Sequence, residues 1–412
     1  MNRVVVTGMG VITPIGMNVD TFWENIKAGQ SGISTIDTFD VTDLKVKIAG
    51  LVRGFDAAER WGRKEARKMD MYCQYALAAA EEAVESSGLK FDAVDKERFG
   101  VYVGSGIGGL NVIIDGQDHL QKRGPGRVSP SLIPMMIANV ATAQISIRFG
   151  AQGPSMAPVT ACSTGNTSIG EAFNAIRYGD ADVMIAGGAE AAITPLSLAS
   201  FGNAKALSMG NEDPSKASRP FDGGRDGFVM AEGAGLLVME SLEHALRREA
   251  HIYGEVVGYG SSSDAYHVVV SHPEGAGAYI AMKNALKKAA IDPKDVDVIS
   301  AHGTGTLVGD ASETKAIKRL FQDDAYKVPI TANKSIIGHM FGAAGGAEAV
   351  ALLKTLEQGM IPPTINQEQP DPECDLDYVP NRARKQDVTT GISNSFGFGG
   401  HNACLVFKRY TD

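Results

Sequence analysis

Short apolar and β-branched runs alternate along this chain with longer stretches of helical periodicity. The short runs predict strands, and apolar residues spaced three and four apart predict helices. In the first half, the expected elements are strands at residues 3–8, 99–103, 183–187 and 233–240 and helices at 66–88 and 168–178. In the second half, they are strands at 255–260, 296–302 and 403–408 and helices at 276–290 and 346–358. The pattern predicts an α/β fold with buried sheets. A boundary near residues 245–255 divides it into halves 1–250 and 251–412 that pack as one unit.

Composition narrows the class of protein without changing this picture. The chain has 412 residues, of which 44% are hydrophobic and 21% charged, so it can bury a large core and is neither disordered nor fibrous. A net charge of −9 argues against nucleic acid as the main partner, although a local basic patch is compatible with it. The four cysteines form no CxxC pair, which is typical of reduced thiols in a cytoplasmic protein.

No targeting or membrane-spanning segment is expected. The start, MNRVVVTGMG, lacks the long apolar core of a signal peptide. Residues 128–170 carry a single charge, Arg148, but prolines, glycines and polar residues interrupt this stretch too often for a membrane span. So long an uncharged stretch predicts burial, either in the core or in a subunit interface, and the sequence leaves both readings open.

One glycine motif, VYVGSGIGGL, fits the pattern G-x-G-x-x-G with Gly104, Gly106 and Gly109 between a strand and a helix. This pattern is typical of dinucleotide-binding loops, but no strand ending in an acidic residue follows about 20 positions later. A glycine-lined turn beside an active site is the favoured interpretation. The stretch 222–226 has only a faint likeness to a calcium loop. The histidines lack metal-ligand spacing, so no metal site is expected.

The segment SMAPVTACSTGNTSIG is the stronger candidate for chemistry. An extended stretch ends at Cys162, and small residues then open a helix. A thiol at a helix N-terminus lies at the positive end of the helix dipole, which lowers its pKa and favours the thiolate. The alternative for any single cysteine is an inert buried thiol, as expected for Cys73 and Cys404. Because Ser163 and Gly165 leave room for a substrate, we interpret Cys162 as a nucleophile.

Two histidines and a C-terminal loop complete the candidate site. His302 ends the predicted strand VISAH before the turn GTGT, and His339 ends NKSIIGH before the small-residue run GAAGG. Each histidine alone is more often a buried structural residue, but two at strand-to-loop junctions among glycines indicate an active site. In the loop NSFGFGGHN, Phe398 lies between glycines, so it can swing or present its backbone N–H to a ligand.

Together these motifs resemble those of the condensing β-ketoacyl-acyl carrier protein (ACP) synthases, and within that family the bacterial synthase II group. VTACSTG, AHGTGT, NKSIIGH and NSFGFGGHN occur in the family's order, and the likeness extends from VVVTGMGVITPIG to the last strand. The resemblance implies a thiolase-like fold, in which two similar α-β-α-β-α halves form a five-layered subunit, and a homodimer. It also implies a decarboxylating Claisen condensation of malonyl-ACP with acyl-ACP, which gives 3-oxoacyl-ACP and CO2 in type II fatty-acid elongation.

The resemblance assigns roles to individual residues. Cys162 would carry the acyl chain as a thioester, with its own backbone N–H and that of Phe398 as the oxyanion hole. His302 and His339 would stabilise the enolate left by decarboxylation, where donors aimed at developing charge act most strongly. Lys334, tied to carboxylates, would order the site. The supporting carboxylates that the resemblance implies are Glu313, Glu348 and Asp264.

Further implied contacts concern the substrate. The matching residues are Thr304 and Thr306 on the phosphopantetheine arm, Ile107 and Phe201 along the acyl tunnel, and Phe398 and Gly399 at a gate. No cofactor is implied, because the substrates arrive on the phosphopantetheine of the carrier protein. The family does admit a structural monovalent cation.

The implied partner is an acidic acyl carrier protein, which the family docks on a basic patch. The candidate docking residues are Arg63, Lys64, Arg67 and Lys68, which have the spacing of one helix face, together with Arg127 and Lys205. Charge spacing alone favours an ordinary solvated helix face, whereas the resemblance favours docking. No nucleic-acid or membrane partner is expected.

Several positions depart from the family pattern. Gly305 replaces the usual serine of HGTST, a form also found in polyketide ketosynthases. Ser300 stands where some relatives have asparagine near a monovalent cation, and Val268 and Val269 replace a Met-Thr pair. The remaining departures are residues 131–133, in place of an aromatic pair at the tunnel wall, and Gly126, in place of a basic docking residue. None removes a catalytic group, but several bear on chain-length preference.

Four alternatives remain at this point. A ketosynthase of a discrete polyketide pathway shares the chemistry, and Gly305 mildly favours it. A non-catalytic partner such as a chain-length factor usually lacks the nucleophile, so Cys162 argues against that reading. A thiolase would use a second cysteine as base, which the two-histidine arrangement disfavours. A nucleotide-binding oxidoreductase would rest on the Gly104 loop alone.

Overall fold

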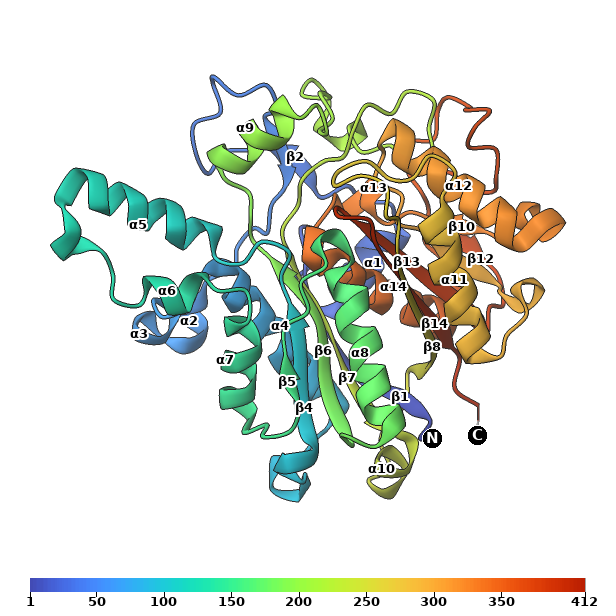
Figure 1. Cartoon of the computed structure of the whole chain (residues 1–412), viewed down its shortest axis with the longest axis horizontal. Coiled ribbons are helices and arrows are strands. Elements are labelled where there is room, and N and C mark those ends of the chain that lie inside the picture. Colours follow the sequence, from blue (N-terminus) through green and yellow to red (C-terminus); the bar gives the residue numbers. More distant parts are fainter. Residues whose placement is uncertain (412) are drawn as a thin grey trace.

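A computed structural model describes residues 1–411, whose main strands form two five-stranded sheets joined edge to edge (Figure 1). The first sheet has the order β1 (Val4–Ile12), β7 (Gly233–Ser241), β6 (Val183–Glu190), β4 (Phe99–Gly104) and β5 (Ser155–Met156). The second has the order β8 (Gly254–Ser263), β14 (His401–Lys408), β13 (Thr390–Gly397), β9 (Val298–Ser300) and β10 (Ile330–Thr331). A short antiparallel contact between β1 and β8 joins the two sheets.

The two sheets share one topology. In each, the first strand in the chain pairs antiparallel with the last, and the last pairs antiparallel with the fourth. The fourth strand runs parallel to the second, and the second runs parallel to the third. The second half of the chain therefore repeats the wiring of the first.

Helices form three layers around these sheets. On the outer face of the first sheet lie α4 (Met71–Ser87) and α7 (Val140–Phe149). On the outer face of the second lies α11 (Ala276–Ala289), with α12 (Leu307–Phe321) packed beside it. Between the sheets lie α8 (Thr164–Tyr178) and α14 (Ala344–Gln358), which contact strands of both. The layers thus follow the order α-β-α-β-α, and the predicted five-layered subunit is present.

The middle layer is buried because each of its helices meets a sheet on both sides. One core cluster includes residues of α8 and α14 together with Leu237 of β7 and Leu405 of β14. Small residues bring the two helices close together, since a Cβ on Gly165 would lie 2.7 Å from the backbone nitrogen of Gly346. This close approach sets the start of α8, and with it Cys162, against the start of α14.

An arm projects from the layers, to the left in Figure 1. It consists of α5 (Leu110–Arg123) and α6 (Leu132–Met136). The fourteen residues of α5 bury Gly116 alone, and Leu132 of α6 packs onto that glycine. The other elements are α1 (Val19–Lys27), α2 (Ala57–Trp61), α3 (Arg63–Ala66), α9 (Pro195–Asn203), α10 (Leu242–Arg247), α13 (Lys334–Ile337) and the pairs β2–β3 (Ile33–Thr35, Ile48–Gly50) and β11–β12 (Met360–Ile361, Arg384–Lys385).

Most predicted elements are present with shifted ends. The helix predicted at 66–88 begins at Met71, because the side chain of Asp70 caps it by accepting the N–H of Tyr72. Helix α12 was not predicted, since its buried face contains Asp310, Ser312 and other polar residues that break the hydrophobic pattern. Every helix within residues 1–411 is too short or too polar to cross a lipid bilayer.

Candidate active site

Cys162 lies in a strained turn at the entrance to α8. The turn Ala161–Ser163 leads directly into the helix, and Ala161 has a φ of +51°. This left-handed conformation costs a non-glycine residue roughly 1–2 kcal/mol. The side chain and the N–H of Ser163 both donate to the carbonyl oxygen of Thr160, at 2.7 and 3.1 Å. These bonds hold the thiol at the start of the helix.

Burial governs the protonation of this thiol. It raises the pKa of Cys162 to about 12, although the charge of Lys334 and the backbone N–H of Phe398 act in the opposite direction. The thiol is therefore protonated at neutral pH, whereas the sequence predicted a thiolate. The prediction was wrong because the pattern indicates a helix start but not how deeply the turn before it is buried.

His302 is held through its backbone. Its N–H and that of Gly303 both donate to the Glu313 carboxylate, each at 2.9 Å. Its carbonyl oxygen accepts a hydrogen bond from Lys334 Nζ at 2.7 Å, and the same ammonium group lies 2.5 Å from Glu348 Oε1. Of the two carboxylates expected beside Lys334, only Glu348 hydrogen-bonds it. Glu313 acts on the His302 turn instead.

The pair of Lys334 and Glu348 is fully enclosed, with side-chain exposures of 1% and 0%. Burial raises the pKa of Glu348 to about 7, and Lys334 lowers it again by direct contact. Removing either partner would leave a buried charge alone, which is costly. The pair therefore fixes the position of the His302 carbonyl.

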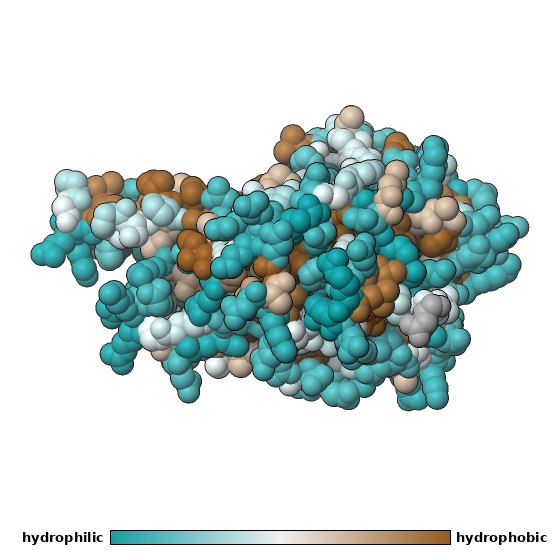
Figure 2. Space-filling view, turned by 90° about the horizontal axis from the view of Figure 1, so that it is seen from below, coloured by the Kyte–Doolittle hydropathy of each residue, from teal (hydrophilic) through white to brown (hydrophobic). Residues whose placement is uncertain are grey.

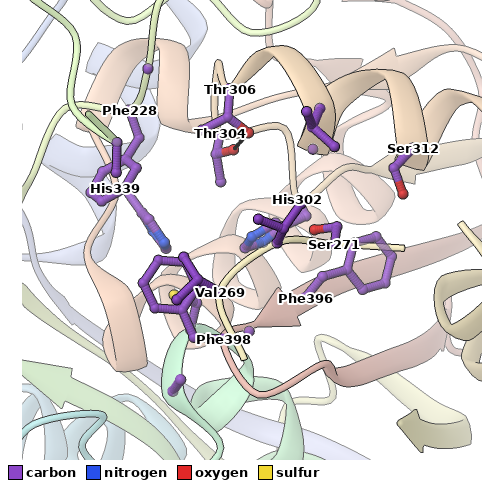
Figure 3. Close-up of a pocket in the computed structure, with 18 of the residues that line it drawn as sticks. Phe228, Val269, Ser271, His302, Thr304, Thr306, Ser312, His339, Phe396 and Phe398 are labelled. Atoms are coloured by element: carbon purple, nitrogen blue, oxygen red, sulfur yellow. Dashed lines mark hydrogen bonds between the residues drawn. The ribbon is translucent and has the colours of Figure 1, made fainter. Parts of the chain in front are cut away.

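His339 faces His302 across the same space. The ring centroids lie 5.5 Å apart with the planes at 87°, and Figure 3 shows the ring nitrogens of both pointing into one cavity. The N–H of His339 donates to Val229 at 2.7 Å, and the rings of Phe228 and Phe341 flank its imidazole. Burial lowers the pKa of both histidines well below 6.5, and the charge of Lys334 lowers it further. Each ring is thus neutral, with one N–H to donate.

These groups share a cavity of about 460 Å³ with most of the predicted substrate contacts (Figure 3). This size is typical of a small-molecule site. The predicted residues that line it are Cys162, His302, His339, Thr304, Thr306, Ile107, Phe201, Phe398, Asp264 and Lys205. The hydroxyls of Thr304 and Thr306 lie 3.1 Å apart in an otherwise largely apolar wall. Gly399 does not line the cavity.

Phe398 sits on a turn between β13 and β14. The two glycines that follow it, Gly399 and Gly400, have φ values of +85° and +73°. The N–H of Gly399 donates to Val268 at 2.6 Å, and the N–H of Asp264 donates to Gly400 at 2.9 Å. The Phe398 turn and the loop that begins at Asp264 are therefore joined, and both border the cavity.

Asp264 also organises that loop through its carboxylate. One oxygen accepts from the amide of Asn402 at 2.8 Å and the other from the N–H of His272 at 3.1 Å. The Phe398 ring lies 6.2 Å from that of Phe201, against the cavity wall. Asp264 thus supports the turn that carries Phe398.

Comparison with known proteins accounts for this geometry. The family model for the β-ketoacyl synthase N-terminal domain matches residues 1–245, and the one for the C-terminal domain matches residues 253–368. The chain belongs to the β-ketoacyl synthase family. The resemblance inferred from the motifs is therefore confirmed.

Individual relatives cover almost the whole of this β-ketoacyl synthase. It is 49% identical over 408 residues to a 3-oxoacyl-[acyl-carrier-protein] synthase 2 of Synechocystis sp., which spans 99% of this chain and 98% of the relative. It is 50% identical, with the same coverage, to a protein of that name from Staphylococcus aureus.

Solved structures confirm the thiolase-like ketosynthase fold. A type II polyketide ketosynthase, solved in complex with its acyl carrier protein and bound to the hexaketide, has a TM-score of 0.93 at 36% identity. A β-ketoacyl synthase from Burkholderia phymatum has a TM-score of 0.92 at 34% identity. In both comparisons the alignment covers 100% of each chain.

The six basic residues expected to dock a carrier protein are all exposed but come from separate elements. Arg63, Lys64, Arg67 and Lys68 lie in and just after α3, Arg127 lies in the turn after α5, and Lys205 follows α9. Figure 1 shows α3 and α9 on opposite sides of the arm. Lys205 is the member of this set that lines the cavity.

Sequence reasoning missed two buried carboxylates that accept the backbone N–H groups of cavity-lining residues. Asp310 accepts the backbone N–H groups of Thr304 and Gly305, each at 3.1 Å, and so shapes the turn after His302. Burial raises the pKa of Asp310 to about 7. Glu190, at the end of β6, is the second. A single acidic residue within the small-residue run VMIAGGAEAAI was the signal that could have found it.

The structure explains one departure from the family pattern. Gly305 has a φ of +84°, a conformation that glycine adopts freely and a serine does not. Glycine at position 305 therefore avoids the strain that a serine would carry in this turn. Within residues 1–411, His, Cys, Asp and Glu side chains form no group of three or more suited to hold a metal ion.

Proposed function

We propose that this β-ketoacyl synthase condenses malonyl-ACP with an acyl-ACP, with loss of CO2, through a thioester on Cys162. The observation that carries the proposal is the convergence of one cysteine, held in a strained turn, and two neutral, buried histidines on one cavity. The relatives named 3-oxoacyl-[acyl-carrier-protein] synthase 2 support the elongation of fatty acids as the setting.

In the first step, the sulfur of Cys162 attacks the acyl thioester of the carrier protein. The bond from sulfur to the acyl carbon forms, the carrier thiol leaves, and the proton of Cys162 passes to that thiol. The charge that builds on the acyl oxygen is met by the backbone N–H groups of Cys162 and Phe398. The high pKa of the free thiol makes this transfer of its proton part of the reaction.

In the second step, malonyl-ACP binds in the part of the cavity that the first carrier protein has left, and it loses CO2. The electron pair of the broken C–C bond forms an enolate, whose oxygen accepts the N–H groups of His302 and His339. The enolate carbon attacks the Cys162 thioester, and the cysteine sulfur leaves and regains a proton from water. Neutral imidazoles suit this role, since each donates one hydrogen bond without releasing its proton.

The two halves divide this work. We assign the nucleophile to residues 1–250, and both histidines and the Phe398 gate to residues 251–412. Lys334, Glu348 and Glu313 act as positioning residues behind His302. Thr304 and Thr306 offer hydroxyls to the phosphopantetheine arm, and Ile107 and Phe201 border the acyl chain.

The acyl carrier protein docks on exposed basic residues that include Lys205 at the cavity. A Lys205→Glu variant is expected to raise the KM for carrier-bound substrates, since charges at the rim of an interface act mainly on association. The KM of this variant should also depend less on salt concentration than that of the wild type. The matched control is Lys294→Glu, an exposed lysine outside the cavity. Equal KM values in both variants would contradict a role for Lys205 in docking the carrier protein.

A second copy of this chain is the other partner. Residues 128–170, left open as core or interface, carry exposed apolar side chains, and Figure 2 shows such residues on the projecting arm and beside it. The exposed members along this surface are Ile113, Leu120, Ile133, Ile137, Ile147, Met156 and Val159. Strand β5 also ends the first sheet with an unpaired edge, which favours pairing with another chain. We assign this surface to a homodimer interface.

No step requires a cofactor beyond the phosphopantetheine on which the substrates arrive. A structural monovalent cation would suit oxygen donors, and the buried oxygens Ser300 Oγ and Glu348 Oε2 have no hydrogen-bond partner among residues 1–411. Four buried free cysteines fit the reducing cytoplasm, where we place the reaction.

A panel of acyl-ACPs with malonyl-ACP tests the proposal. Extension of saturated and cis-unsaturated medium and long chains would establish fatty-acid elongation. The ketosynthase and chain-length factor structures, at 36% identity, keep a polyketide pathway as the second candidate. Acylation of Cys162 without extension on the fatty-acid carrier would favour that candidate instead.

A further inference from the structure

Within the glycine motif of residues 104–109, the mechanism above uses only Ile107, and it leaves the glycines themselves without a role. The loop joins β4 to α5, and Gly106 and Ile107 line the cavity. In a dinucleotide site, such a loop turns its backbone N–H groups toward a phosphate. Here the same groups face a carboxylate of the protein itself, that of Glu190.

Glu190 is fully buried, and four donors converge on its two oxygens. Oε1 accepts the hydroxyl of Ser105 at 2.6 Å and the N–H of Ile107 at 3.2 Å. Oε2 accepts the N–H of Gly106 at 2.8 Å and that of Gly342 at 3.1 Å. The carboxylate therefore occupies the place that a bound anion has in a phosphate loop.

The glycines are needed because the carboxylate is packed so closely. A Cβ on Gly106 would lie 2.9 Å from Glu190 Oε2, and a Cβ on Gly342 would lie 2.6 Å from the nitrogen of Gly106. Both distances are shorter than side chains tolerate. Two backbone turns and one carboxylate thus form a single packed unit.

This unit fixes two walls of the cavity at once. Ile107 lies on the first turn and borders the cavity. Gly342 on the second turn follows Phe341, whose ring lies 5.0 Å from that of His339 and 5.5 Å from that of Phe201. A shift of the carboxylate would move Ile107 and Phe341 relative to each other.

We propose that Glu190 is a positioning residue that sets the acyl-chain preference of this enzyme, because its carboxylate holds the Ile107 and Phe341 walls in register. The proposal rests on the proposed function, in which an acyl chain on Cys162 lies between these walls. In an apolar pocket, one methylene group is worth about 10-fold or more in discrimination. A small displacement of either wall is therefore enough to change which chains fit.

The charge of Glu190 gives a second, independent readout. Burial raises the pKa of Glu190, but four donors and no acceptor face the carboxyl, so the ionised form is the one that fits the site. That charge also acts on Cys162 and contributes to the raised pKa of its thiol. Neutralising residue 190 should therefore make the thiol more acidic.

Glu190→Gln tests the proposal, with Glu82→Gln as the matched control. Glu82 is a partly buried carboxylate that also accepts two backbone N–H groups, but its partners, Val11 and Val19, do not line the cavity. Each variant is assayed for kcat and KM with short, medium and long acyl-ACPs. Alkylation of Cys162 by iodoacetamide is followed against pH without substrate.

We expect Glu190→Gln to change the ratio of kcat/KM for long over short chains by roughly tenfold. We also expect it to leave the KM for malonyl-ACP unchanged and to shift the alkylation profile to lower pH. Glu82→Gln should change neither the chain-length ratio nor the alkylation profile. If Glu190→Gln does not fold, Ser105→Ala removes one donor and should change the ratio in the same direction by a smaller factor.

The outcomes separate the two proposals. A Glu190→Gln enzyme can be acylated on Cys162 and yet keep the wild-type ratio of kcat/KM for long over short chains, or show a kcat/KM that falls by the same factor for every chain length. Either result overturns the role of Glu190 alone. A wild-type enzyme that is never acylated on Cys162 overturns the proposed function and this role with it.

Discussion

The groups assigned to the chemistry, Cys162, His302 and His339, are all neutral in the resting site. Burial keeps the thiol protonated, with a pKa of about 12, and keeps both imidazoles unprotonated, with pKa values well below 6.5. Lys334 contributes to the lowered pKa of both histidines but opposes the raised pKa of Cys162, since a nearby positive charge favours a thiolate and disfavours an imidazolium. A neutral site suits a reaction in which negative charge builds up only transiently, on the acyl oxygen and on the enolate.

The neutral histidines predict a pH profile. As the pH falls from 8 through 6.5, a histidine whose pKa is lowered stays unprotonated and keeps both its N–H and its lone pair. Decarboxylation of malonyl-ACP should therefore hold its rate across this range. The test is CO2 release by enzyme whose Cys162 is already acylated, and a fall by half near pH 6.5 would contradict neutral histidines.

Replacing either histidine should separate the two steps. His302→Ala or His339→Ala is expected to slow decarboxylation by about 10²–10³, the usual effect of losing one donor to a developing oxyanion. Acylation of Cys162 should remain, because its donors are the backbone N–H groups of Cys162 and Phe398. Loss of acylation in equal measure would place the histidines in the first step instead.

At the residue scale, the sequence predicted the chemically reactive side chains but not their environment. Cys162, His302 and His339 stand out because each lies among glycines at the end of a strand or the start of a helix. Glu190 and Asp310 escaped, since they act on backbone N–H groups, which leave no signal in the sequence, and those bound to Glu190 lie 84 and 152 residues away. The pKa of Cys162 was predicted in the wrong direction, because burial depends on the whole fold.

At the scale of elements, the Phe398 turn depends on two glycines in left-handed conformation. An alanine at position 400 would be strained by roughly 1–2 kcal/mol, and its Cβ would lie 2.8 Å from that of Asp264. Gly400→Ala should therefore lower the midpoint of chemical denaturation and slow acylation of Cys162. Gly202→Ala is the control, since no atom lies within 4 Å of that Cβ and alanine favours its helix.

Equal stability of these two glycine variants would contradict the strained turn.

Among the elements themselves, the middle helices α8 and α14 were predicted within a few residues of their ends. The arm was not foreseen as a projection, because α5 has an ordinary helical sequence and its environment depends on what covers it. The β1–β8 contact that joins the sheets links segments about 250 residues apart and leaves no local signal.

At the scale of the whole molecule, the proposed homodimer would cover the projecting arm. Only one of the fourteen residues of α5, Gly116, is buried within this chain, whereas helices in proteins owe most of their stability to tertiary packing. Exposed apolar residues beside it, among them Ile147 at 76% exposure, would be covered in a dimer. We expect the protein to sediment as a dimer at micromolar concentration.

A charge placed on this surface should dissociate the dimer. Ile147→Glu is expected to raise the dissociation constant by about 30-fold or more, as for the loss of a central interface residue. Leu246→Glu, on α10 away from the arm, introduces the same change at another exposed apolar residue and should leave the dimer intact. Sedimentation velocity decides between them, and a monomeric wild-type protein would refute the interface.

The central claim is that Cys162 carries the acyl chain between the two substrates. Intact-protein mass spectrometry after incubation with a medium-chain acyl-ACP tests it directly, followed by addition of malonyl-ACP. We expect one acyl group per chain on Cys162, its disappearance with malonyl-ACP as CO2 and 3-oxoacyl-ACP appear, and neither event in Cys162→Ala. Product formed by Cys162→Ala, or an acyl group on any other residue, would contradict it.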